Sequence, residues 1–246
     1  MRGVKVAALY DVHGNLPALE AVLADPRLDG VDLIVSGGDL VVGPLPAECL
    51  DRLEAEGPRV RFLTGNCDRE ACAPEGSELG EVAAWCNALL GADRVARIEA
   101  WPGTVELDVS GSVSALFCHA TPASDMPILT RATPEADAAR ELAGVAAQVV
   151  VCGHTHVQYD RRVGGIRLVN AGSVGMPYEG SPDARWALVG SDGIELLSTA
   201  YDAEWALDEL RGTGFPLVEQ WLAPVLRGET TAEEATDEFE RRRRGA

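Results

Sequence analysis

All four histidines of the chain lie at the ends of short apolar runs that have the length of buried strands: His13, His119, His154 and His156. His154 and His156 follow residues 149–152 and are two positions apart, so in an extended backbone both imidazoles leave the chain on the same side. Asp11 and His13 repeat this spacing after residues 4–9. Imidazole and carboxylate groups are ligands that transition-metal cations accept.

Two further apolar runs end in oxygen-bearing side chains. Residues 31–35 lead into Asp39, and residues 59–63 lead into Asn66. Because the loops after the carboxyl ends of the strands form the ligand crevice of an open α/β sheet, we expect all of these side chains to meet. Two aspartates, one asparagine and four histidines exceed what one tetrahedral site takes, which favours two metals about 3.5–4 Å apart. The pattern predicts a two-metal hydrolytic site.

The order of these pieces resembles that of the calcineurin-like metallophosphoesterase superfamily. The matching motifs are Asp11-x-His13, Gly38-Asp39, Gly65-Asn66-x-Asp68, His119 and Gly153-His154-x-His156. The likeness is strongest to the small prokaryotic phosphodiesterase and phosphatase branch, in which the Gly-Asn-Cys-Asp variant also occurs. It covers roughly residues 4–175, and residues 170–173 resemble a loop that supports the site in that branch.

The resemblance implies the roles of the site residues. One metal would be held by Asp11, His13 and His156, and the other by Asn66, His119 and His154, with Asp39 bridging the pair. The catalytic residues would be Asp39, Asn66, Cys67 and Asp68, where Asp68 can orient its loop or a neighbouring ligand. The expected cofactor is a pair of divalent cations, with Mn²⁺ first and Fe, Zn²⁺, Ni²⁺ or Co²⁺ as alternatives. A hydroxide between the metals would attack phosphorus in line.

One position departs from much of the superfamily, in which a histidine follows the Gly-Asn pair and can protonate the leaving group. Here Cys67 stands at that position. A thiol with a pKa of about 8.5 is a poor general acid near neutrality. We therefore expect a preference for substrates whose leaving group needs little protonation, such as activated phosphodiesters, with phosphomonoesters as a second class.

Three other residues are candidates for contact with the substrate. Asn15 is predicted to cap the helix that begins at Leu16, and its amide is a further candidate ligand of the substrate phosphate. Arg69 and Arg131 are candidate ligands of the phosphate oxygens. The pocket beyond the metals is expected to be built by the loops 69–78, 120–133 and 174–185.

Composition limits the possible functions. The net charge of −18 argues against a standing nucleic-acid partner and hence against a nuclease, because such proteins need a basic face. Alternatives that stay open are a serine/threonine-type protein phosphatase, a nucleotide phosphatase and a scaffold that has lost catalysis. The expected partner is a phosphoester substrate, without a membrane, and the oligomeric state is open, a homodimer included.

The six cysteines show no CxxC spacing and are expected to be reduced. With no apolar stretch of 18 residues and no signal-peptide pattern at the start, the sequence predicts a cytoplasmic protein.

The predicted fold is of the α/β (α+β) class. Residues 4–63 read as two β-α-β units with helices at 16–24 and 46–56, and a further helix is expected at 77–90. After residue 104 the pattern changes to hairpins, at 104–118, 159–169 and 184–199, with a short helix at 134–142 and a strand at 149–152. The family resemblance implies a four-layer α-β-β-α sandwich of two mixed sheets between helices.

Residues 1–200 are assigned to this domain, and residues 201–246 to a C-terminal helical extension packed on it. Gly212-Thr213-Gly214 should interrupt that extension. It could form an added layer, a cap near the crevice or a dimer surface. Its last feature, the arginine run 241–244, is either a solvated tail or a contact for an anionic partner.

Overall fold

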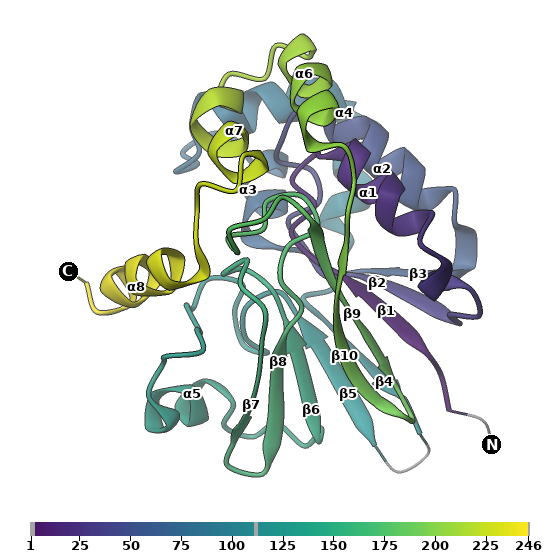
Figure 1. Ribbon diagram of the computed structural model, residues 1–246, viewed down its shortest axis with the longest axis vertical. Helices are drawn as coiled ribbons and strands as arrows, with labels where there is room; N and C mark the ends of the chain where they lie inside the picture. The colour runs from purple at the N-terminus through teal and green to yellow at the C-terminus, as the bar shows by residue number, and fades with distance from the viewer. Residues whose placement is uncertain (1–2, 111–112, 246) are drawn as a thin grey trace.

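The computed structural model describes residues 3–110 and 113–245 and contains two five-stranded mixed sheets (Figure 1). The first sheet has the order β10-β9-β1-β2-β3, and the second has the order β4-β5-β6-β8-β7. In the first, β1 (Val6–Leu9), β2 (Leu33–Ser36) and β3 (Val60–Phe62) are parallel. The hairpin of β9 (Ala184–Gly190) and β10 (Gly193–Thr199) joins this sheet antiparallel to β1.

The second sheet also combines parallel and antiparallel strands. Its parallel centre consists of β5 (Ser114–Cys118), β6 (Val149–Cys152) and β8 (Ile166–Asn170). The antiparallel edge strands are β4 (Thr104–Asp108) and β7 (Tyr159–Val163). All three predicted hairpins are therefore present. The turn of the first was predicted at residues 110–112, of which 111 and 112 lie outside the described residues.

Alternating side chains of the central strands fill three separate apolar cores, and this alternation produces the four layers. Val6 and Ala8 of β1 pack between the sheets, together with Val149 and Val151 of β6. The intervening residues of β1 face the helices on the outer side of the first sheet, and Val150 of β6 faces the outer side of the second. A strand that is covered on both faces is apolar throughout, and for this reason the apolar runs of β1 and β6 predicted buried strands. The predicted four-layer sandwich is confirmed.

The helices outside the first sheet are α1 (Leu16–Leu23), α2 (Pro46–Glu54) and α4 (Glu81–Glu99), and outside the second lies α5 (Glu135–Glu141). Short 3₁₀ turns occupy residues 26–28 and 57–59. The predicted helix 77–90 begins later and runs further than expected, with a kink at Gly91. A helix that the sequence did not predict, α3 (Asn66–Cys72), occupies the start of the expected loop 69–78.

The C-terminal segment packs on the domain through its apolar residues. It comprises α6 (Ala203–Gly212), a π-helical turn (Val218–Leu222), α7 (Ala223–Leu226) and α8 (Ala232–Arg243). The predicted break is where α6 ends, and Leu210, Phe215 and Leu222 belong to the same core as α1 and α2. The arginine run 241–244 is largely helical and is no loose tail. No helix in the described ranges 3–110 and 113–245 is long and apolar enough to cross a membrane.

Candidate metal centre

The seven predicted ligands lie on loops at one end of the two sheets. Asp11 and His13 follow β1, Asp39 follows β2, and Asn66 begins α3 after β3. His119 directly follows β5, and His154 and His156 follow β6. The carboxyl ends of these parallel strands meet at one edge, as open α/β sheets require. The folded chain thus brings together residues that are up to 145 positions apart in the sequence, since the first is Asp11 and the last is His156.

Backbone strain is concentrated in this cluster. Five non-glycine residues have a positive φ, between 48° and 67°, and they are the only ones in the described part of the chain: Asp11, His13, Asp39, His154 and His156. Non-glycine residues rarely adopt this conformation, and it persists only where the surrounding structure enforces it, often at functional sites. Each of the five is a predicted ligand. The loops therefore hold these side chains at a cost in local conformational energy.

Hydrogen bonds to the backbone fix the orientation of three imidazoles. The Nδ1 atoms of His13, His119 and His156 lie 3.1, 3.1 and 2.9 Å from backbone carbonyl oxygens, which belong to Val42, Gly37 and Met176 respectively. Because a carbonyl can only accept, Nδ1 must carry the hydrogen in each ring. The opposite nitrogen, Nε2, then points into the cluster, which is the arrangement found in metal-binding histidines.

Two features of the cluster require a positive charge between the side chains. The Nε2 atoms of His13 and His156 face each other at 3.1 Å, and two lone pairs at that distance repel unless a proton or a cation lies between them. Asp11 Oδ1 is buried, has no hydrogen-bond partner and lies 3.4 Å from His156 Nε2. A buried carboxylate oxygen without a partner is costly. The donor set therefore fits divalent cations, which would relieve both features.

Burial and neighbouring charges set the pKa of each histidine in the cluster. Burial by itself would lower the pKa of His119, but the carboxylates of Asp39 and Asp11 raise it to about 10. Burial, followed by repulsion from His119, lowers the pKa of His154 to about 4. Burial lowers the pKa of His13, and electrostatic repulsion from His156 lowers it further. His13 is therefore neutral at pH 7, and a metal cation rather than a proton is the better partner for its Nε2.

The predicted ligands form two groups of ligand atoms, and a third group of atoms that could hold a metal consists of His13, Asp39 and Cys67. The ligand atoms of Asp11, His13 and His156 lie within 4.8 Å of one another, and so do those of Asp39, His119 and His154. Asp39 Oδ2 faces both groups, 3.8 Å from His13 Nε2 and 3.4 Å from His119 Nε2. Its other oxygen, Oδ1, accepts a hydrogen bond of 2.9 Å from the backbone amide of Cys67. This geometry leaves one oxygen of Asp39 available to be shared.

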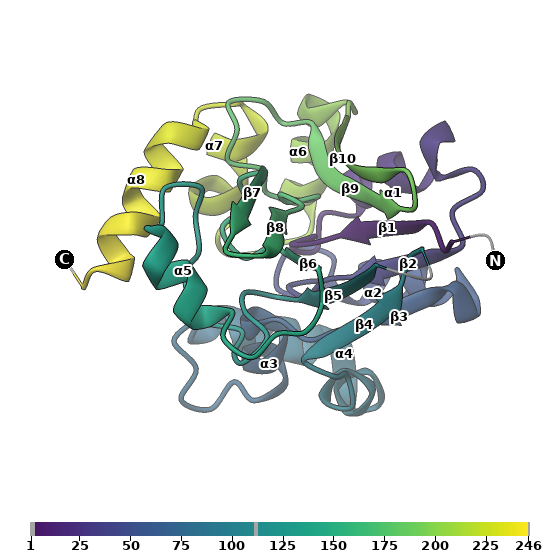
Figure 2. The same cartoon turned by 90° about the horizontal axis from the view of Figure 1, so that it is seen from below.

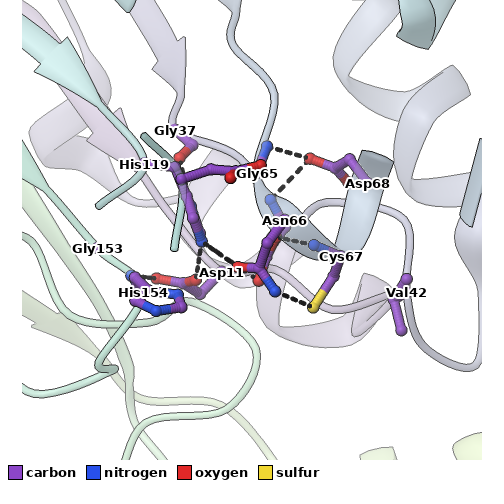
Figure 3. A network of polar contacts seen from close by, with 12 residues as sticks. Asp11, Gly37, Val42, Gly65, Asn66, Cys67, Asp68, His119, Gly153 and His154 are labelled. Atoms are coloured by element: carbon purple, nitrogen blue, oxygen red, sulfur yellow. Dashed lines mark hydrogen bonds and ion pairs between the residues drawn. The ribbon is translucent and has the colours of Figure 1, made fainter. Parts of the chain in front are cut away.

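Asp68 holds the loops together from behind the cluster (Figure 3). Its fully buried carboxylate accepts four backbone hydrogen bonds of 2.7 to 3.1 Å, from the amides of Asp39, Leu40, Val41 and Gly65. The bond from Gly65 also caps the first turn of α3. Asp68 thereby fixes the loop of Asp39 relative to the start of α3, where Asn66 lies.

Cys67 lies on the same turn and points toward Asn66, whose Nδ2 donates to its Sγ at 3.4 Å (Figure 3). Burial, and then the nearby Asp39 carboxylate, raise the pKa of the thiol well above its usual value. A proton held this firmly is poorly suited to transfer to a leaving group near neutral pH.

Two predicted substrate contacts lie elsewhere. Asn15 caps α1, since its Oδ1 accepts from Ala18, and its fully buried amide donates to Gly175 and Tyr201. The carboxylate of Asp125 binds Arg69 through two hydrogen bonds of 2.9 and 3.1 Å. Neither residue lines the pocket over the metal ligands, and neither does Arg131. Asn15 thus has a structural role, and the pairing with Asp125 directs Arg69 away from the site.

The loop 170–173 supports the cluster, as the resemblance implies. Asn170 donates to Gly153 O and to Thr155 Oγ1 and so holds the turn that carries His154. Ser173 donates to Asp11 O at 2.7 Å and accepts from the amide of Met176, which is the residue whose carbonyl orients His156.

A pocket of about 710 Å³ opens over the predicted ligands. Of the three loops expected to build it, only 174–185 contributes, through Met176 and Tyr178. No residue of the loops 69–78 and 120–133 lines it, although residues 121–125 line a separate, smaller pocket beside His119. The opposite wall is the C-terminal segment, from the π-helical turn to α8. Sequence reasoning missed Tyr178, Trp221, Phe239 and two of the terminal arginines as lining residues. The signal was present in the amphipathic pattern and arginine run of residues 202–244.

Comparisons with known proteins agree with this architecture. A family model described as "Calcineurin-like phosphoesterase superfamily domain" matches residues 4–191. An uncharacterized protein of Methanocaldococcus jannaschii is 25% identical over 244 residues, covering 90% of this chain and 96% of that protein. Phosphodiesterase YfcE of Escherichia coli is 24% identical over 204 residues, covering 79% of this chain and 92% of YfcE.

Two solved structures share the fold over most of both chains. The crystal structure of a metallophosphoesterase from Sphaerobacter thermophilus has a TM-score of 0.72 and 25% identity, and covers 89% of this chain and 98% of that one. The crystal structure of a hypothetical protein from Pyrococcus horikoshii has a TM-score of 0.74 and 20% identity, covering 87% and 94%.

Proposed function

Because the chain belongs to the calcineurin-like phosphoesterase superfamily, we propose that it is a dinuclear metal-dependent phosphoesterase that hydrolyses phosphodiesters in preference to monoesters. The observation that carries the proposal is the cluster of Nε2 and carboxylate oxygen atoms around Asp39, which leaves a buried oxygen of Asp11 unpaired. Asp11, His13 and His156 would hold one cation and Asn66, His119 and His154 the other, with Asp39 shared. Mn²⁺ is the first candidate, and Fe, Zn²⁺, Ni²⁺ and Co²⁺ are alternatives.

When bound, the two cations would polarise the phosphoryl oxygens and activate a water molecule as the nucleophile. The protein holds the predicted ligands in fixed positions before substrate binds. Backbone hydrogen bonds and loop residues in the left-handed conformation maintain these positions. Preorganised charge of this kind lowers a barrier without reorganisation during the reaction.

The expected preference for esters with stable leaving groups, activated phosphodiesters among them, rests on Cys67. A thiol with a raised pKa keeps its proton, so the leaving group has to depart without help from this position. Esters with stable leaving groups tolerate that, whereas alkyl monoesters do not. YfcE, the Escherichia coli relative, is named a phosphodiesterase, which is in line with this preference.

The proposal is tested with bis-p-nitrophenyl phosphate and p-nitrophenyl phosphate, using protein stripped of metal and then supplied with Mn²⁺, Zn²⁺, Ni²⁺ or Mg²⁺. We expect hydrolysis only after metal is restored, with a higher kcat/KM for the diester. Faster monoester cleavage would refute the diester preference. If the protein binds metal and hydrolyses neither compound, the scaffold alternative replaces the enzyme.

Cys67→His is expected to raise activity on an alkyl monoester such as glycerol 2-phosphate by at least about tenfold, because a positioned general acid contributes about 10²- to 10⁴-fold. The initial rate of phosphate release at saturating Mn²⁺ measures this. Cys67→Ser removes the thiol without supplying an imidazole and should show no such gain. An unchanged rate in Cys67→His would mean that protonation at this position does not limit the reaction.

A further inference from the structure

The outer wall of the pocket contains a continuous line of π contacts that begins at a predicted metal ligand. The ring of Tyr178 stacks on His156 at 4.7 Å between centroids, and Phe239 of α8 lies 6.3 Å from Tyr178. The guanidinium of Arg242 lies over the ring of Phe239, 5.8 Å from its centroid. All four residues line the same pocket. Flat apolar surface therefore connects the metal centre to a cation on the last helix.

Hydrogen bonds to the buried Glu240 side chain hold helix α8 in this position. Glu240 is 3% exposed, and its Oε1 accepts hydrogen bonds from the hydroxyls of Thr130 and Thr133 at 2.7 and 2.6 Å. Its other oxygen binds Arg243, which also pairs with Asp137 of α5. Figure 2 shows α8 and α5 side by side at the edge of the molecule. A charge buried with this many partners fixes one arrangement of the helix.

This contact divides the four terminal arginines into two pairs. Arg243 and Arg244 face Glu240, whereas Arg241 and Arg242 line the pocket. Both pocket arginines form ion pairs with one carboxylate, Glu238. Each arginine is placed against Glu238 through one nitrogen, and both side chains are more than 60% exposed, so further guanidinium N–H donors stay accessible to a ligand. Glu234, which also lines the pocket, forms the capping box at the start of α8 with Thr231.

We propose that α8 forms a second anion subsite of the phosphoesterase pocket, in which Arg242, assisted by Arg241, binds a second phosphate of the substrate. The aromatic line from Tyr178 to Phe239 would stack against the nucleobase of that substrate. The substrate class is therefore a nucleotide ester that bears a second phosphate away from the bond that is cleaved. This inference rests on the proposed function, because the first phosphate is placed at the metal centre.

The chemistry of the two arginines suits this role. A guanidinium offers paired N–H donors that match phosphate oxygens, and its charge is permanent. Aromatic rings bind a nucleobase by stacking, as single-strand binding proteins do. In a chain with a net charge of −18, two exposed guanidinium groups on the pocket wall also give an anionic substrate a local point of attraction.

The test uses two substrates that share the reacting bond and differ by one phosphate. They are the 5′-p-nitrophenyl ester of thymidine 3′,5′-bisphosphate and the p-nitrophenyl ester of thymidine 5′-phosphate. With the Mn²⁺-loaded full chain, we expect the bisphosphate ester to have a kcat/KM about tenfold higher, mainly through a lower KM, since hydrogen bonds between charged groups are among the strongest. Arg242→Gln should reduce that ratio to near one.

Arg244→Gln is the matched control, because it removes the same group from the same helix outside the pocket, and it should keep the wild-type ratio. A ratio near one in the wild type, or a ratio that Arg242→Gln leaves unchanged, would overturn the second subsite while the proposed function stands. If neither ester is hydrolysed, the proposed function fails, and calorimetric binding of thymidine 3′,5′-bisphosphate decides the subsite. Binding about tenfold weaker in Arg242→Gln supports it, and equal binding refutes it.

Discussion

Asp39→Asn is expected to lower phosphodiester hydrolysis by more than about 100-fold and to prevent the protein from retaining two metal ions. Asp39 Oδ2 is the oxygen that faces both groups of predicted ligands. Loss of a residue that merely supports a metal ligand already costs about 10- to 100-fold, so loss of a shared ligand should cost more. Asparagine also tolerates the left-handed backbone of this position, where φ is 53°. The substitution therefore removes charge without new backbone strain.

Metal content per chain after dialysis and kcat on bis-p-nitrophenyl phosphate measure the effect. Asp29→Asn provides the control, because it makes the same chemical change at an exposed residue outside the pocket. Normal turnover with two retained ions in Asp39→Asn would eliminate the shared-ligand role.

Asp68→Asn is expected to reduce the free energy of unfolding by about 3 kcal/mol and to weaken metal binding by about 10- to 100-fold. The carboxylate accepts four backbone hydrogen bonds in a site with no exposure to solvent. An asparagine amide has one accepting oxygen, and its NH₂ group would face backbone donors. The loops that carry Asp39 and Asn66 would then be free to separate.

A metal titration distinguishes positioning from catalysis at this residue. If Asp68 acts only by holding the loops, kcat should return to within about tenfold of wild type when Mn²⁺ is raised to saturation. A kcat that stays low at saturation would make Asp68 a participant in the reaction itself. Denaturant unfolding of the metal-free proteins gives the stability change separately.

The sequence predicted the parts of the fold that depend on local patterns. Fully apolar runs such as 149–152 identified strands covered on both faces, and the side chains that follow them identified the edge where a site would form. The family resemblance then supplied the four-layer arrangement. Helix α3 was missed because it has only seven residues and begins after Gly65, which offers no capping side chain.

Other features of the site depend on contacts between distant segments. The positive φ at His154 and His156 results from the packing of their loop against Asp11, whose Oδ2 accepts from the amide of His154. A Cβ on Gly153 would lie 2.4 Å from the same oxygen, so only glycine allows the carboxylate to approach. Spacing in the sequence carried no information about either contact.

The individual residues of the pocket wall could not be predicted for the same reason, although a cap near the crevice was one of the expectations for the C-terminal extension. The orientation of the arginine run 241–244 depends on the hydrogen bonds that Thr130 and Thr133 donate to Glu240. Because these bonds join segments more than 100 residues apart, the sequence did not indicate which arginines would face the substrate. The sequence likewise did not indicate that Arg69, a predicted phosphate ligand, pairs with Asp125.

A stoichiometric titration of the metal-stripped protein with Mn²⁺ shows whether the loops around Asp39 hold two divalent cations. Bound metal is counted by elemental analysis and compared with hydrolysis of bis-p-nitrophenyl phosphate at each point. We expect binding to saturate at two ions per chain and activity to rise with the second ion. Saturation at one ion with full activity, or no tight binding at all, would contradict this expectation.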